Sequence, residues 1–193
     1  MKRLILASAS PRRREVLRNA GFLFEVVPSR VDEYYSGDDD RPAALAERTA
    51  GEKAEEVVKR FGPEDDVVVL AADTLVVVDA RVLGKPRSPE EAAAMLEKLS
   101  GRAHEVITGV ALAAPGTPRR TLAHELTRVF FRPLTRQEID AYVASGEPLD
   151  KAGAYAVQGR AGRFVTRVEG CYFNIMGLPV ALVDRLLREW ERG

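Results

Sequence analysis

The chain has 193 residues, of which 46% are hydrophobic and 30% charged, and 29 basic residues balance 29 acidic ones. A net charge of zero argues against general attraction to nucleic acid or a membrane surface, and a single cysteine excludes an intrachain disulfide. The N-terminal apolar run is too short for a secretion signal, and no run approaches the roughly 20 residues of a membrane span. We therefore expect a cytoplasmic protein with one domain over 1–193.

Strands and helices are predicted to alternate in the first half of the chain. The expected elements are a strand at 3–8, a helix at 11–21, a strand at 22–29, a polar loop at 31–41, a long helix at 42–62 and two β-rich runs within 66–86. Ser10 and Pro11 are typical of a helix N-terminus. The polar pair Asp73-Thr74 interrupts a long apolar run, so we expect it to separate the two β-rich runs.

The second half is predicted to contain a hairpin and three helices. The expected elements are a helix at 88–101, hairpin strands at 103–116 and 119–134, a helix at 135–146, an irregular stretch at 148–164, a strand and turn at 164–177 and a final helix at 179–193. Ser88 and Thr135 each precede a glutamate by three residues, the pattern of a capping box. The fold class predicted is mixed α/β: a partly antiparallel sheet flanked by helices, with two lobes around a cleft.

The segment SASPRRR, residues 8–14, lies where a strand gives way to a helix. A helix N-terminus presents free N–H groups and partial positive charge, and small residues such as Ser8 let an anion approach the backbone. Arg12 and Arg13 can add paired hydrogen bonds to phosphate oxygens. The alternative is a capped helix whose arginines are merely solvated. The spacing is not that of a P-loop.

Asp73 follows a run of apolar strand-forming residues, so it is predicted at the end of a buried strand. A buried carboxylate needs a partner, because burying it alone is costly. It could bind Mg²⁺ or activate a water, and equally it could cap a turn with Thr74.

Three further residues are candidates on weaker grounds. Lys85 lies in a Gly-Lys-Pro turn before a helix, Lys53 lies in the long helix, and Gln158 lies between small residues. Each has an ordinary structural explanation: a surface turn, a solvated helix position and a glycine-rich loop. Together with the two arginines, however, the lysines would form a cationic cluster around Asp73, as phosphoryl chemistry requires.

Several motifs, taken together, resemble those of a known family. The motifs are SxSPRR at 8–13, ADT at 72–74, GKP at 84–86, TG at 108–109 and AGAYAVQG followed by VEGCYFNIMGLP, and they occur in the order found in the Maf family. The resemblance covers nearly the whole chain. It implies a nucleoside triphosphate pyrophosphatase with a long twisted sheet like that of the inosine triphosphate pyrophosphatases. It also implies a divalent cation, Mg²⁺ or Mn²⁺, as cofactor and, in many members, a homodimer.

The resemblance also implies roles for residues at matching positions. Asp73 would be the catalytic carboxylate that accepts a proton from the attacking water. Arg12, Thr74 and Gln158 would occupy the positions linked to substrate choice.

For the phosphates, the resemblance implies ligands from three motifs. Lys53 and Lys85 would hold phosphates, with Arg13 and Ser8 in support. Glu33, together with Asp73, would bind the metal. One departure from the family pattern is Cys171-Tyr172-Phe173, where members more often carry Ser-Tyr-Tyr.

The residues linked to substrate choice resemble the branch that hydrolyses dTTP and UTP. The alternatives are a 7-methyl-GTP pyrophosphatase of the same family and a nucleotide-binding regulator of septum formation. The presence of Asp73, Lys53 and Lys85 argues against a site that has lost its chemistry.

Overall fold

A seven-stranded mixed sheet forms the centre of the molecule. The computed structural model describes residues 2–32 and 41–192, and the strand order is β2-β1-β3-β5-β6-β7, with β4 paired to β3. The strands are β1 (Arg3–Leu6), β2 (Phe24–Val26), β3 (Val67–Val78), β4 (Arg81–Leu83), β5 (Ala103–Ala113), β6 (Arg120–Phe131) and β7 (Val165–Glu169). β1 is parallel to β2 and β3, and the remaining pairs are antiparallel. The predicted mixed α/β fold with its β5–β6 hairpin is confirmed.

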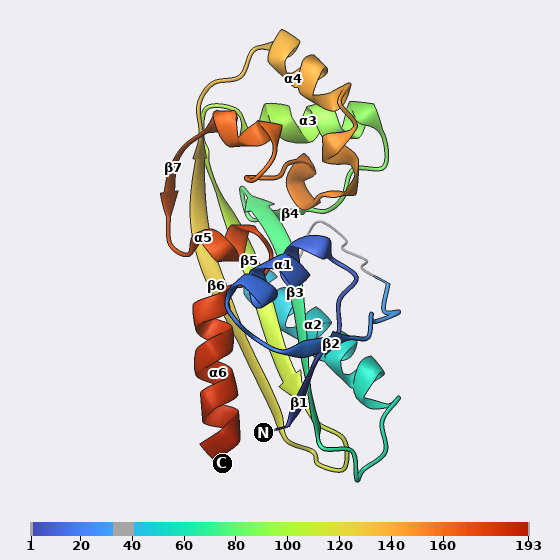
Figure 1. Ribbon diagram of the computed structural model, residues 1–193. Coiled ribbons are helices and arrows are strands. Elements are labelled where there is room, and N and C mark those ends of the chain that lie inside the picture. Colours follow the sequence, from blue (N-terminus) through green and yellow to red (C-terminus); the bar gives the residue numbers. More distant parts are fainter. Residues whose placement is uncertain (1, 33–40, 193) are drawn as a thin grey trace.

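The helices cover both faces and one end of this sheet (Figure 1). They are α1 (Pro11–Asn19), α2 (Pro42–Val58), α3 (Pro89–Leu99), α4 (Arg136–Val143), α5 (Tyr172–Ile175) and α6 (Val180–Arg192), with 3₁₀ turns η1 (Glu147–Asp150), η2 (Ala152–Ala154) and η3 (Arg160–Phe164). None of the described helices is long and apolar enough to cross a membrane. The division into two lobes stays a prediction.

Three residues predicted to be N-caps accept hydrogen bonds through their side-chain oxygens at the starts of helices. Ser10 caps α1, and Thr135 forms a complete capping box with Glu138. At α3 half of the expected box is present. Ser88 accepts a hydrogen bond from the backbone N–H of Glu91, whose carboxylate instead accepts one from the backbone N–H of Arg87.

Strand β3 corrects one prediction. It runs unbroken through Asp73 and Thr74, because the ladder to β5 continues there, with Asp73 opposite Gly109. The chain turns only at Asp79 and Ala80, which have φ angles of 50° and 60° and connect β3 to β4 as a two-residue hairpin. Asp73 therefore lies in the middle of a buried strand and not at its end.

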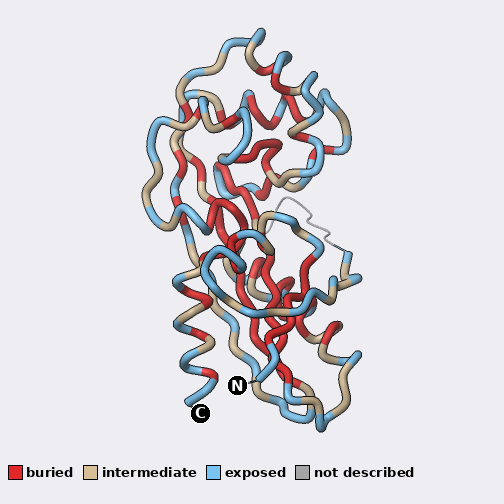
Figure 2. Tube along the Cα trace, viewed as in Figure 1, coloured by how far each residue is buried: buried red, intermediate tan, exposed pale blue. Residues whose placement is uncertain are grey.

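Alternation along β3 sends neighbouring side chains into different cores. Ala71 and Leu75 face α2, whereas Ala72 and Val76 face the other side of the sheet. Figure 2 shows the resulting buried stripe along the central strands, with exposure concentrated in the outer turns and helix surfaces.

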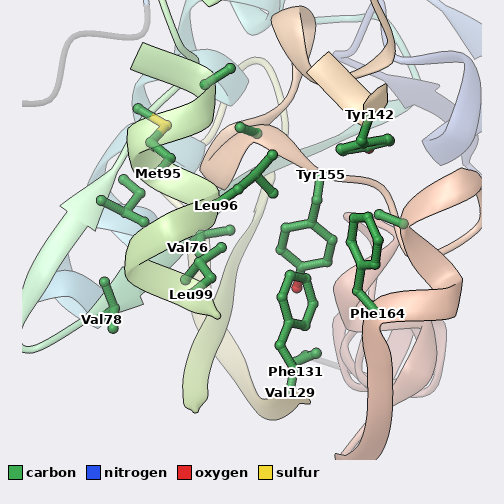
Figure 3. Close-up of a cluster of buried hydrophobic side chains, with 14 of the residues drawn as sticks. Val76, Val78, Met95, Leu96, Leu99, Val129, Phe131, Tyr142, Tyr155 and Phe164 are labelled. Atoms are coloured by element: carbon green, nitrogen blue, oxygen red, sulfur yellow. The ribbon is translucent and has the colours of Figure 1, made fainter. Parts of the chain in front are cut away.

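An aromatic cluster closes the end of the sheet under α3 and α4 (Figure 3). Phe131 lies edge-on to Tyr155 and to His104, with ring centroids 4.9 and 5.0 Å apart. Nε2 of His104 lies 2.8 Å from the hydroxyl of Tyr155. Burial lowers the pKa of His104 to about 4, so this imidazole is neutral near pH 7.

Candidate active site

A cavity of about 370 Å³ opens beside an interruption in the edge of the sheet. On the side away from β5, β3 pairs with β1 as far as Leu70 and with β4 from Val76 onward. Among the described residues no strand covers the intervening 71–75 on that side. Asp73 and Thr74 belong to opposite faces of the strand, yet both border this cavity. The unpaired edge explains how consecutive residues reach one site.

Lys53 reaches Asp73 because α2 packs unusually close to β5. A Cβ atom added to Gly109 would lie 2.2 Å from the carbonyl oxygen of Ala46, so only glycine permits this approach. Ala46 and Lys53 are two helical turns apart on the buried face of α2. Nζ of Lys53 lies 2.6 Å from Oδ1 of Asp73, with both side chains buried. The sequence predicted the cluster, and the structure identifies this pair within it.

The loop after β1 and the first turn of α1 form the wall opposite the strand. Oγ of Ser8 accepts a hydrogen bond from the backbone N–H of Ser10, and the Ser10 hydroxyl caps the backbone N–H of Arg13. Ala9 and Pro11 border the same cavity. The positive end of the helix therefore faces the space where an anion would bind.

The two arginines predicted to bind phosphate have different environments. Arg13 is 9% exposed, and its guanidinium donates hydrogen bonds to the carbonyl of Gly177, to Ser8 Oγ and to Thr74 Oγ1, at 2.8, 3.3 and 3.1 Å. Arg12 is half-buried and borders the cavity. Burial and the neighbouring Arg13 lower the pKa of Arg12, against an opposing effect of Asp150. Arg12 is thus the more accessible cation, and Arg13 is held by the fold.

Lys85 and Asp150 complete the charged part of the cavity. Lys85 is exposed in the turn before α3, and Asp150 ends η1. Asp150 was not among the residues predicted to form the site. Its signal was weak, because an aspartate before a Lys-Ala-Gly stretch is also common in ordinary loops. With Asp73, it is the second acidic residue in the described lining, and its negative charge acts to raise the pKa of Arg12.

Two of the predicted site residues are not brought to this cavity by the described structure. Gln158 is exposed in a turn and is absent from the residues that line the cavity. Glu33 lies outside the described residues. Their implied roles therefore stay predictions.

The described part of the lining contains four cationic side chains, from Arg12, Arg13, Lys53 and Lys85, and two acidic ones, from Asp73 and Asp150. This excess of positive charge suits a polyanion. Another part of the lining, which includes Val76, Val106, Tyr155 and Ile175, is largely apolar. The arrangement can hold phosphates at the cationic part while a flat, partly apolar group lies against the rest.

Comparison with known proteins agrees with this chemistry. The chain is 48% identical over 190 residues to a dTTP/UTP pyrophosphatase of Pelotomaculum thermopropionicum. The alignment covers 98% of this chain and 97% of that protein. The chain is 51% identical over 187 residues to a dTTP/UTP pyrophosphatase of Moorella thermoacetica, in an alignment that covers 97% and 94%.

Among solved structures, the Ham1 protein of Staphylococcus aureus overlaps 97% of this chain and 99% of that chain at 16% identity and a TM-score of 0.48. That overlap is too loose to add to the assignment. A model of the family described as Maf-like protein, in contrast, matches residues 3–190. The chain therefore belongs to the Maf family.

Proposed function

We propose that this protein is a nucleoside triphosphate pyrophosphatase that hydrolyses dTTP and UTP to the monophosphate and pyrophosphate. The observation that carries the proposal is the buried carboxylate of Asp73, which lines the same cavity as Arg12, Arg13, Lys53 and Lys85. Relatives about half identical to this chain are named for that activity. The choice of pyrimidine nucleotides rests on those relatives.

Water attacks the α-phosphorus, and Asp73 accepts the proton that this water loses. The bond between the α-phosphorus and the bridging oxygen breaks, and that oxygen leaves on pyrophosphate. Arg12 and Lys85, which border the cavity, balance the negative charge that develops on the leaving group. Lys53, which donates to Asp73, also lines the cavity, and its positive charge would attract a phosphate there.

A divalent cation fits this donor set through Asp73 and the triphosphate oxygens. Mg²⁺ commonly takes one or two carboxylates plus substrate phosphates, and no group of three His, Cys, Asp or Glu residues suited to a metal occurs among the described residues. A bound Mg²⁺ or Mn²⁺ would neutralise phosphate charge and lower the pKa of a bound water. Glu33 remains the second proposed ligand, on the family resemblance alone.

The test is pyrophosphate release by the purified protein with Mg²⁺ or Mn²⁺ across dTTP, UTP, CTP, 7-methyl-GTP and ITP. Hydrolysis in ¹⁸O-labelled water then locates the attack. We expect preference for dTTP and UTP and label in the monophosphate alone. Label in pyrophosphate would contradict attack at the α-phosphorus.

Two other results of this experiment would each support one of the alternative functions. Preference for 7-methyl-GTP would overturn the proposed substrate and keep the reaction. Binding of UTP with no pyrophosphate released under any condition would support a regulatory protein. The homodimer also stays a proposal, and analytical ultracentrifugation of the same preparation measures it.

A further inference from the structure

Five residues beside the cavity are connected in a closed ring of hydrogen bonds. Nη2 of Arg13 lies 3.1 Å from Oγ1 of Thr74, which lies 3.0 Å from Oγ1 of Thr108. Thr108 Oγ1 lies 3.1 Å from the backbone carbonyl oxygen of Asn174, and that oxygen lies 2.9 Å from the backbone nitrogen of Gly177. The Gly177 carbonyl accepts from Nε of Arg13 and closes the ring. The ring joins α1, β3, β5, α5 and the turn after α5.

The chemistry of the groups fixes the direction of every hydrogen bond. The backbone carbonyl of Asn174 can only accept a hydrogen bond, so the Thr108 hydroxyl donates its one hydrogen to it. Thr74 must therefore donate to Thr108, and its oxygen accepts from Arg13. The Thr74 hydroxyl thus has its hydrogen committed inside the protein and cannot donate it to a nucleotide without breaking the ring.

The ring uses part of the Arg13 guanidinium and leaves part for a ligand. Its contacts with Gly177, Thr74 and Ser8 occupy three of five N–H groups. Within the described part of the chain, one N–H on each terminal nitrogen remains. A phosphate oxygen pair takes two parallel N–H groups of an arginine, provided the plane of the guanidinium is held in the correct orientation.

Gly177 brings the backbone of the ring next to Arg13 and Thr74 in a left-handed conformation. Its φ is 99°, and an added Cβ would lie 3.4 Å from both Arg13 Nε and Thr74 Oγ1. The two residues before it, Ile175 and Met176, line the cavity. The ring therefore fixes the position of the Arg13 guanidinium relative to this segment of the cavity wall.

We propose that Thr108, which does not border the cavity, is a positioning residue that orients Arg13 for the substrate phosphates. Thr74 influences substrate choice through the same ring and not by donating to the base. The inference rests on the proposed pyrophosphatase function. Thr108 is fully buried, and the two hydrogen bonds that its hydroxyl makes within the described residues both belong to the ring.

A neighbouring residue supplies a matched control. Thr127 is also fully buried, and its hydroxyl donates to the carbonyl of Cys171 and accepts from Nδ2 of Asn174. Replacing either threonine with valine removes one donor and one acceptor at constant shape. Only the Thr108 change breaks the ring that contains Arg13.

The experiment measures kcat and KM for dTTP in Thr108→Val, Thr108→Ser and Thr127→Val. We expect Thr108→Val to raise KM about tenfold or more, the scale of losing a charge-assisted contact, with a smaller change in kcat. Thr108→Ser should restore KM, and Thr127→Val should stay within about twofold while losing similar stability. Equal KM effects in both valine variants, or none in Thr108→Val, would overturn the proposal.

Two readouts separate the ring from the pyrophosphatase assignment. The ¹⁵Nε–¹H signal of Arg13 should exchange slowly with solvent in the wild type and in Thr127→Val and faster in Thr108→Val. Calorimetric titration with inorganic tripolyphosphate should show weaker binding in Thr108→Val alone. A wild type that releases no pyrophosphate would refute the function and leave both readouts decisive; unchanged exchange and unchanged binding would refute the ring.

Thr74→Val provides a final check by double-mutant cycle. If both threonines act through one ring, Thr74→Val combined with Thr108→Val should raise KM no more than either change alone. Multiplication of the two effects would show that Thr74 acts separately and would overturn the claim that it acts through the ring.

Discussion

The ammonium of Lys53 lies 2.6 Å from the carboxylate of Asp73, and both groups are almost entirely buried. They come from a helix and a strand 20 residues apart in sequence, and the absence of a side chain at Gly109 lets the two elements meet. Removing one partner of a buried ion pair leaves an uncompensated charge, which is strongly destabilising. Chemistry and packing are therefore coupled at this pair.

Replacing Asp73 with asparagine should abolish most of the activity. The new amide would still accept a hydrogen bond from Lys53, but it could not take the proton of the attacking water. We expect pyrophosphate release to fall by about 10²–10⁴-fold, the usual contribution of a general base. Asp79→Asn is the control, since Asp79 lies in the β3–β4 turn and asparagine tolerates its positive φ. Near-normal turnover in Asp73→Asn would show that another group accepts the proton.

Gly109→Ala should push α2 away from the sheet. Its Cβ would lie 2.2 Å from the Ala46 carbonyl oxygen, so backbone must move, and overpacking of this kind typically costs about 1–3 kcal/mol. Activity should fall as well, because the shift separates Lys53 from Asp73. Urea unfolding and dTTP turnover measure the two effects.

Gly51→Ala is the matched control for that substitution. Gly51 lies in α2, the helix that packs against Gly109, but its added Cβ would meet only the flexible end of the Leu122 side chain, at 3.2 Å. Alanine favours helix by about 0.5–1 kcal/mol over glycine, so stability should stay equal or rise. A similar loss in both variants would mean that the close approach at Gly109 is unimportant.

Arg12 and Lys85 should matter for substrate and little for stability. Both border the cavity, and loss of one charge-assisted contact costs about 1.5–3 kcal/mol, so alanine at either position should lower kcat/KM by roughly ten- to more than a hundredfold. Thermal unfolding should be nearly unchanged. Unchanged kcat/KM in both variants would place the phosphates elsewhere.

Arg13→Lys should behave differently from those two alanine variants. A lysine cannot reproduce three bonds made by a planar guanidinium, so both stability and kcat/KM should fall. The comparison of melting temperatures between Arg13→Lys and Arg12→Lys tests this distinction. Equal melting temperatures would contradict a structural role for Arg13.

Stability should decrease as the pH falls from about 6.5 to 4 because of His104. The unfolded chain binds a proton on this residue near pH 6.5, whereas burial lowers the pKa in the folded protein to about 4. Below pH 6.5 protons therefore favour the unfolded state, by about 3 kcal/mol once pH 4 is reached. Urea unfolding of the wild type and of His104→Gln across this range should show the steeper decline in the wild type. Parallel profiles would refute it.

The sequence allowed much of the site to be predicted, because strand ends, helix starts and charged motifs are local signals. Ser8, Arg12, Lys85 and Asp73 were selected from such signals and do line one cavity. The break expected at Asp73-Thr74 was wrong, because the polarity of two residues was weighed without the β5 partner that continues the strand.

Long-range contacts were beyond sequence reasoning. Arg13 is bonded to a carbonyl 164 residues away, so its commitment to the fold has no local signature. Thr108 and Asn174 were quoted as parts of motifs, but only the folded chain shows their polar groups meeting. The same applies to Asp150, whose contribution depends on the distance to Arg12 in space.

The pairing of Asp73 with Gly109 fixes how β3 must align against β5. A slip of β3 by one residue against β5 would send every side chain to the opposite face of the sheet. If the slip brought Thr74 opposite Gly109, the carboxylate would point toward the layer that holds Arg13, and the Thr74 hydroxyl would lie beside the buried ammonium of Lys53. An alignment error of a few ångströms, with the apolar content of both strands unchanged, would therefore replace the acid beside Lys53 with an alcohol. Strand register is thus part of its chemistry.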